Sequence, residues 1–224
     1  MTGRLVIVSG TGTSIGKTHV SEALLRAANR ALPRVLGIKP VETGLEEAHL
    51  SDSERLERAS SFHVEQTGYL FGPPVSPHLA ARESGQIIEL EAIQSMVELA
   101  RQNADLTLVE LAGGLFTPLS ESLLNIDVVR SLGADFVLIV APDRLGVLHD
   151  VLAAARGARA KGVAFDAILL VAPELSDAST SRNCSELSLF IDHCPIYEVP
   201  RASVTDLAHH PVLIQLARDV AGPS

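Results

Sequence analysis

Along most of the chain, short apolar runs alternate with longer segments in which apolar residues recur every three or four positions. The runs have the length of buried strands and cover residues 5–8, 35–38, 106–109, 136–140, 167–171 and, more weakly, 196–199. The segments between them carry apolar stripes that begin at Val20, Leu90 and Leu148, as in helices with one buried face. This alternation predicts an α/β fold with a doubly wound, mostly parallel sheet and helices on both faces.

The stretch from about residue 44 to residue 89 departs from this rhythm. It carries Asp52 in a polar, helix-like segment, which is followed by the proline-rich run 72–78. Because 224 residues suit one domain, we interpret the stretch as a substrate- and metal-binding excursion above the strand ends. Residues 1–224 are therefore expected to form a single domain.

The composition is that of an aliphatic, acidic protein. Apolar residues make up 46% of the chain and aromatic residues 4%, so aliphatic side chains must fill the core. The net charge of −9 argues against non-specific binding to nucleic acid or to an anionic membrane. We see no leader-like segment and no membrane-spanning run, and expect a cytoplasmic protein. Cys184 and Cys194 lack zinc or redox spacing and are expected to be reduced thiols.

A glycine-rich loop, Gly-Thr-Gly-Thr-Ser-Ile-Gly-Lys-Thr, joins the first strand to the following helix, from Gly10 to Thr18. Free backbone N–H groups and the positive end of the helix dipole converge on an anion at such a junction. The lysine reaches the outer phosphates, and the threonine hydroxyl suits Mg²⁺. The loop predicts a P-loop NTPase type of fold, although it is one residue longer than the standard pattern, and an ordinary tight turn is the less favoured alternative. The expected triphosphate contacts are Gly12, Thr13, Ser14, Ile15, Gly16, Lys17 and Thr18.

Charged residues follow two other strands of the predicted sheet. Glu110 ends the third strand, where a carboxylate can hold Mg²⁺ or contact the nucleotide, and Asp52 is a second candidate ligand. Lys39 ends the second strand, which should lie beside the first or one place away, so its ammonium can face the terminal phosphate. Each residue also has an alternative interpretation without a role in binding. Glu110 can be a salt-bridged carboxylate, Asp52 a solvated helix cap and Lys39 a solvated charge.

Taken together, these motifs resemble those of the dethiobiotin synthetase family. The family carries the long loop seen here from Gly10 to Thr18 and a Lys-Pro-Val-x-Ser/Thr-Gly motif, present as Lys39 to Gly44 with Thr43 in the hydroxyl position. Further similarities are Ser-Pro-His at residues 76–78, Val-Glu followed by Ala-Gly-Gly at 109–114, Pro-Leu at 118–119 and Leu-Gly at 145–146. The resemblance runs in register from the first strand to about residue 150 and fades in the last third.

The resemblance implies an ATP-dependent carbon–nitrogen cyclo-ligase that uses Mg²⁺ and closes a cyclic urea on 7,8-diaminononanoate with CO₂. It places Thr13, Lys17 and Lys39 around the carbamate and the γ-phosphate. Thr43 would bind the carbamate or diamine. The Mg²⁺ ligands implied are Thr18, Asp52 and Glu110. The resemblance also implies a homodimer with the substrate site at the subunit interface, where Leu145, Gly146 and His149 bind the substrate carboxylate of the neighbouring subunit.

Several positions depart from the family pattern. Leu111 replaces a glycine, and we expect its bulky side chain where the substrate should be contacted. His149 stands where the family often has asparagine, and an ordinary helix-start or surface histidine is an equally good interpretation of it. The adenine-binding asparagine expected after the fifth strand is missing, because Val-Ala-Pro-Glu occupies residues 171–174.

Other classes of function remain as alternatives. A partitioning or septum-positioning ATPase shares the loop type, but residues 11–13 lack its additional lysine and the C-terminal segment lacks a basic amphipathic helix. A cobyrinate-type amide synthetase needs a second, glutaminase domain for which there is no room. A divergent relative that binds nucleotide but no longer turns over the diamine stays open.

Overall fold

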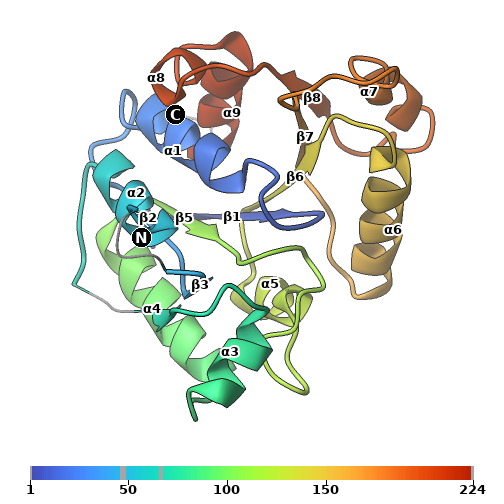
Figure 1. Ribbon diagram of the computed structural model, residues 1–224. Helices are drawn as coiled ribbons and strands as arrows, with labels where there is room; N and C mark the ends of the chain where they lie inside the picture. Colours follow the sequence, from blue (N-terminus) through green and yellow to red (C-terminus); the bar gives the residue numbers. More distant parts are fainter. Residues whose placement is uncertain (1, 46–48, 66–67, 223–224) are drawn as a thin grey trace.

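The computed structural model describes residues 2–45, 49–65 and 68–222, which are built around a six-stranded sheet (Figure 1). The order across the sheet is β2-β5-β1-β6-β7-β8, and neighbouring strands are parallel throughout. The strands are β1 (Arg4–Gly10), β2 (Val35–Ile38), β5 (Leu106–Glu110), β6 (Phe136–Pro142), β7 (Ala167–Val171) and β8 (Ile196–Val199). The predicted α/β class is confirmed, and β8, the weakest predicted strand, lies at an edge of the sheet.

Helices cover both faces of this sheet, as Figure 1 shows. One face carries α1 (Lys17–Ala28), α2 (Asp52–Ala59), α8 (Val204–Leu207) and α9 (Pro211–Ala221). The other carries α3 (Pro77–Glu83), α4 (Leu90–Asn103), α5 (Asn125–Leu132), α6 (Val147–Ala160) and α7 (Asn183–Leu187). In β1, Leu5 and Ile7 join one apolar cluster, whereas Val6 and Val8 join the other. Because both faces of the strands are buried, the strands are continuous aliphatic runs in the sequence.

The irregular stretch from residue 44 to residue 89 contains α2, β4 (Tyr69–Phe71) and α3, with residues 46–48 and 66–67 outside the described part. β4 pairs in parallel with β3 (Val41–Thr43), forming a small sheet that the hydrophobic pattern did not predict. Strands of three residues are too short to show a period of two. Leu56 of α2 and Phe71 of β4 are buried in the two main apolar clusters, so the stretch packs against the central sheet.

The strand order brings three carboxyl ends together at one edge of the sheet. β5 lies between β1 and β2, and its residue Val109 is opposite both Ile7 and Ile38. Glu110, Lys39 and the loop after β1 therefore leave the sheet side by side, which is where doubly wound proteins bind their ligands. Lys39 follows a strand one place away from β1, within the range that the sequence predicted.

Candidate nucleotide and metal site

The loop after β1 has the backbone of an anion-binding turn. Gly16 adopts a left-handed φ of 93°, and a Cβ atom at this position would lie 3.3 Å from Cγ1 of Val171. Gly16 is also the N-cap of α1 and has no capping side chain, so the first N–H groups of α1 are left for a ligand. No acidic residue lies in the first turn of α1 to compete with an anion there.

Lys17 points back over this loop. Its Nζ donates a hydrogen bond to the carbonyl oxygen of Gly12 at 2.6 Å, and its residue exposure is only 6%. Burial lowers the pKa of Lys17 to about 8, with Lys39 also lowering it and Glu110 and Asp52 opposing the shift. A lysine held in this way gains from a nearby phosphate, because the phosphate stabilises its charged form.

Glu110 is a fully buried carboxylate that accepts hydrogen bonds on both oxygens. Its Oε1 accepts from Thr18 Oγ1 at 2.7 Å and from Lys39 Nζ at 3.0 Å, and its Oε2 accepts from Ser21 Oγ at 2.8 Å. A buried charge is tolerated only when it is paired and hydrogen-bonded, and both conditions are met here. Glu110 is therefore held in one position beside the loop.

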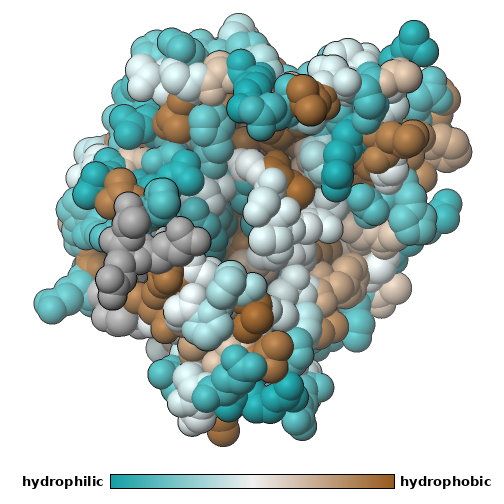
Figure 2. All heavy atoms as spheres, viewed as in Figure 1, coloured by the Kyte–Doolittle hydropathy of each residue, from teal (hydrophilic) through white to brown (hydrophobic). Residues whose placement is uncertain are grey.

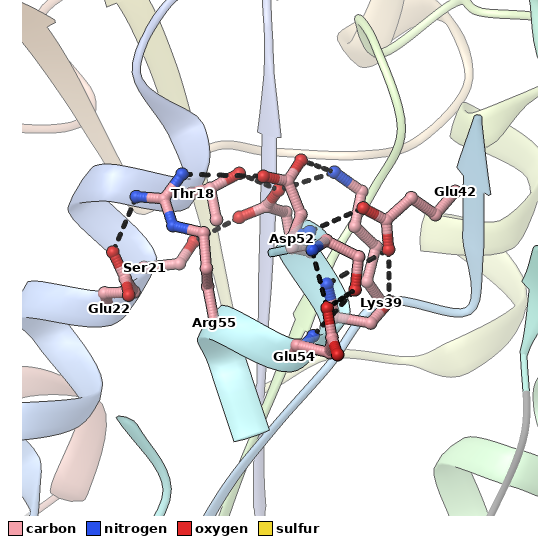
Figure 3. A network of polar contacts seen from close by, with 11 residues as sticks. Thr18, Ser21, Glu22, Lys39, Glu42, Asp52, Glu54 and Arg55 are labelled. Carbon is pink, nitrogen blue, oxygen red and sulfur yellow. Dashed lines mark hydrogen bonds and ion pairs between the residues drawn. The ribbon is translucent and has the colours of Figure 1, made fainter. Parts of the chain in front are cut away.

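Lys39 joins Glu110 to Asp52, because its ammonium also donates to the Asp52 carboxylate (Figure 3). The Lys39 side chain is only 7% exposed. Burial alone would lower the pKa of Lys39, but Glu110 and Asp52 outweigh it and raise the pKa. Burial likewise acts to raise the pKa of Asp52, but Lys39, with smaller contributions from Thr18 and Arg55, outweighs it, so that this pKa is lowered. Lys39 and Asp52 are therefore both charged near neutral pH.

These donors suit a magnesium ion shared with phosphates. The Thr18 hydroxyl contacts Glu110, and Lys39 connects Glu110 with Asp52, so three hard oxygen groups surround one place. Within the described ranges there is no group of three or more histidine, cysteine or acidic residues that could hold a metal by itself. Mg²⁺ is usually held by one or two carboxylates, waters and substrate phosphates rather than by a complete protein cage, so the residues fit this ion.

A cavity of about 810 Å³ opens in front of these groups, and Figure 2 shows this face hollowed near its middle. The site residues predicted from the sequence that line the cavity are Thr13, Ser14, Ile15, Gly16, Lys17, Thr18, Lys39, Thr43, Asp52 and Glu110. Gly12 faces a neighbouring hollow, which His149 also lines. Leu145, Gly146 and His149 lie at the exposed start of α6 and do not line the main cavity.

The chain is similar to known proteins over most of its length. A family model described as an AAA domain matches residues 4–216. The chain is 33% identical over 215 residues to the ATP-dependent dethiobiotin synthetase of Caulobacter sp. (strain K31), covering 92% of this chain and 93% of that relative. It is 38% identical over 162 residues to the synthetase of Nitrosospira multiformis, covering 70% and 71% of the two chains.

The chain belongs to the dethiobiotin synthetase family. The resemblance inferred from the motifs is thus confirmed, and with it the prediction of an ATP-dependent ligase rather than a protein of another class.

Solved structures outside the dethiobiotin synthetase family share the fold. MinD in the MinC:MinD complex of Aquifex aeolicus matches with a TM-score of 0.59 and 15% identity, over 99% of this chain and 97% of that chain. A ParA family ATPase from Chlorobium tepidum TLS matches with a TM-score of 0.58 and 17% identity, over 98% of each chain. At such identities the likeness shows the fold alone.

In the described part, no helix has the length and apolar character needed to span a membrane.

One expectation about departures from the dethiobiotin synthetase pattern is wrong. Leu111 does not enter the cavity, because its side chain is buried in the apolar cluster on the α4–α6 face. Successive residues of an extended chain point to opposite sides, so Glu110 faces the site while Leu111 faces the core. The replacement of glycine by leucine therefore leaves the cavity open.

Three buried polar residues contribute to the site without having been predicted. Ser21 lies one helical turn after Thr18 on α1, a spacing that could have revealed its contact with Glu110. Asn125 donates from Nδ2 to the carbonyl oxygens of Ala112 and Gly114, at 2.7 and 2.8 Å, and so holds the loop after β5. Glu42 had no expected role, and its contacts link α2 to β3. No local signal in the sequence indicated a role for Asn125 or Glu42.

Another hollow continues from the outer side of the loop toward the carboxyl ends of β6, β7 and β8. Its described lining includes Arg144, Glu174 and Arg201 but no asparagine. Glu174 Oε1 forms an exposed ion pair with Arg201 at 3.5 Å.

Proposed function

We propose that this protein is an ATP- and Mg²⁺-dependent dethiobiotin synthetase, which closes a cyclic urea on 7,8-diaminononanoate with CO₂. The observation that carries the proposal is the convergence of Lys17, Lys39, Asp52 and Glu110 on one cavity at the start of α1. The named relatives, which the chain matches over most of its length, supply the substrate class.

The reaction needs no covalent protein nucleophile. One amine of the diamine adds to CO₂ and loses a proton, giving a carbamate. A carbamate oxygen attacks the γ-phosphorus of ATP and ADP leaves, giving a carbamic–phosphoric anhydride. The second amine attacks its carbonyl carbon, the bond to phosphate breaks, and the ring closes with loss of a proton. Catalysis then rests on positioning and charge neutralisation.

The residues of the cavity suit these demands. Lys17 and Lys39 are the buried cations that would face the transferring phosphoryl group, and Thr13 adds a hydroxyl at the cavity wall. Thr43 also lines the cavity and would bind the carbamate or the diamine. Thr18, Asp52 and Glu110 would hold Mg²⁺, which when bound neutralises charge on the β- and γ-phosphates.

The substrate carboxylate is assigned to a second subunit. Leu145 is 80% exposed at the start of α6, and Gly146 caps this helix with a left-handed φ of 97° and no side-chain cap. An uncapped helix start binds carboxylates well. Because Leu145, Gly146 and His149 lie outside the main cavity, they would serve the site of a neighbouring subunit in a homodimer. An enzyme that consumes ATP is expected in the cytoplasm.

The test is phosphate release from ATP with Mg²⁺ and bicarbonate, with and without 7,8-diaminononanoate. We expect release to depend on the diamine and to accompany formation of a cyclic urea, detected by mass spectrometry. Equal release without the diamine would count against the proposal. Stimulation by DNA or lipid would instead favour a regulatory ATPase, and nucleotide binding without turnover would favour a divergent relative.

A further inference from the structure

Glu42, in the middle of β3, is a buried carboxylate that the chemistry above does not use. Only 4% of the residue is exposed. Its Oε1 accepts a hydrogen bond from the backbone N–H of Asp52 at 2.5 Å. Its Oε2 accepts from the backbone N–H and the hydroxyl of Ser53, at 3.0 and 2.5 Å. Two carboxylate oxygens thus take three donors from the first turn of α2 (Figure 3).

These contacts stabilise a buried carboxylate without an ion pair. Within the described ranges, Glu42 has no lysine, arginine or histidine as an ion-pair partner. Its charge is compensated instead by the free N–H groups and the positive dipole end of α2. The helix start and the carboxylate therefore depend on each other, and moving either would leave buried polar groups without partners.

α2 already possesses a cap of its own on the solvent side. Ser51 Oγ accepts from the N–H of Glu54 at 3.1 Å, and the Glu54 carboxylate accepts from the N–H of Ser51 at 2.8 Å. This capping box is sufficient to begin the helix. The additional hydrogen bonds to Glu42 hold the helix start against β3. They therefore determine the position of α2 and are not needed for the helix to form.

The contacts of Glu42 affect the position of Asp52, the first residue of α2. Its backbone N–H is held by Glu42, while its carboxylate contacts Lys39. Lys39 and Glu42 belong to one short segment. This segment therefore contacts Asp52 twice, through its side chain at Lys39 and through its backbone N–H at Glu42. The Asp52 carboxylate also has a hydrogen bond with the Thr18 side chain and a longer ion pair with Arg55, at 3.6 Å.

We propose that Glu42 is a positioning residue for the metal site: by holding the N-terminus of α2 on β3, it sets the place of the Asp52 carboxylate beside Glu110 and Thr18. The inference rests on the magnesium part of the proposed function and not on the identity of the diamine. Groups that orient metal ligands in this way typically contribute about 10–100-fold to metal affinity.

The experiment compares Glu42→Ala and the isosteric Glu42→Gln with Glu54→Gln in the full-length protein. Glu54→Gln alters a carboxylate at the same helix end that does not contact Asp52, so it is the matched control. Calorimetric titration measures the affinity for Mg²⁺ in the presence of a non-hydrolysable ATP analogue, and the affinity for the analogue in EDTA. Circular dichroism and thermal melting establish that each variant is folded at the assay temperature.

We expect Glu42→Ala to weaken Mg²⁺ binding by about 10–100-fold, Glu42→Gln to weaken it less, and Glu54→Gln to leave it unchanged. Binding of the analogue in EDTA should be the same in all four proteins. Equal Mg²⁺ affinity in Glu42→Ala and the wild type, equal loss in Glu42→Ala and Glu54→Gln, or no Mg²⁺ binding by the wild type would each overturn the inference. If Glu42→Ala is unfolded, Glu42→Gln decides in the same way. Failure of the diamine assay with these Mg²⁺ results intact would reject the proposed reaction alone.

Discussion

Replacing Lys39 by methionine tests the centre of the site most directly. The substitution keeps the aliphatic stem of the side chain and removes the ammonium that joins Glu110 to Asp52. Both the stability of the protein and the chemical step are expected to suffer, for different reasons. Stability falls because the buried Glu110 carboxylate loses its cationic partner. Turnover falls because the ammonium that would face the γ-phosphate is absent.

The size of the stability loss follows from burial. Glu110 is fully buried and Lys39 is 7% exposed, whereas the Asp52 side chain is 33% exposed and its charge is partly screened by water. Breaking one partner of a buried ion pair costs about 3–5 kcal/mol, and we expect the lower end here because Thr18 and Ser21 still bond to Glu110. For a protein of this size, 1 kcal/mol corresponds to about 2–4 °C in Tm, so the melting temperature should fall by about 6–12 °C.

The loss in turnover is a separate quantity. Removing one group that stabilises developing charge in a transition state costs about 10²–10³ in kcat. Nucleotide binding should survive, because the loop, Lys17 and the start of α1 remain in place.

Three measurements check these expectations: urea denaturation, calorimetric titration with ATP in EDTA, and diamine-dependent phosphate release below the melting temperature of the variant. Arg34→Met is the control, since Arg34 pairs with Asp105 at 2.8 Å on the exposed surface, with half of its side chain in water. It should change neither stability nor turnover appreciably. Unchanged kcat in Lys39→Met would remove Lys39 from the reaction, and unchanged stability would refute the buried ion pair.

Other variants and conditions probe the surroundings of the site. Ser21→Ala removes a hydrogen bond to Glu110 and should lower the free energy of unfolding by about 1.5–3 kcal/mol. Thr107→Val removes a hydroxyl that has no hydrogen-bond partner among the described residues, so it should leave that free energy unchanged or raise it; urea denaturation of both variants decides. Because burial lowers the pKa of Lys17 to about 8, its ammonium loses a proton as the pH rises through that value. ATP affinity in EDTA, by titration calorimetry, should therefore fall between about pH 7 and pH 9, and a flat profile would contradict this. Leu111→Gly should destabilise the protein by about 2–5 kcal/mol in urea without raising turnover, whereas higher kcat at unchanged stability would place Leu111 in the site.

Much of the fold was predictable because it depends on patterns local in the sequence. β2, β7 and β8 have the predicted bounds, and β1, β5 and β6 extend the predicted runs by one to three residues. Buried parallel strands must be apolar on both faces, and this requirement is visible without knowing what they pack against. The pairing of β3 with β4 was not predictable, because neither three-residue strand carries a pattern and their partners lie far apart in the chain.

The candidate site likewise contains some residues that the sequence predicted and others that it did not. The loop from Gly10 to Thr18 is contiguous, and its geometry follows from where a strand ends and a helix begins, so its residues were found directly. Glu110 and Lys39 were found because each ends a predicted strand, and strand ends of a parallel sheet share one edge. The side of the chain on which Leu111 lies was not determined, since it depends on which face of the sheet the neighbouring helices cover.

By itself, then, the sequence determined the α/β class, the anion-binding loop and the family, because periodicity, glycine placement and motif spacing are local properties. Only the tertiary structure decided which buried polar groups meet. The contact of Glu42 with the start of α2, and that of Ser21 with Glu110, join segments that the chain separates and the packing of helices on the sheet brings together. A hydrogen bond acts over about 3 Å in space, regardless of separation along the chain, and this is why such partners emerge only when the chain is folded.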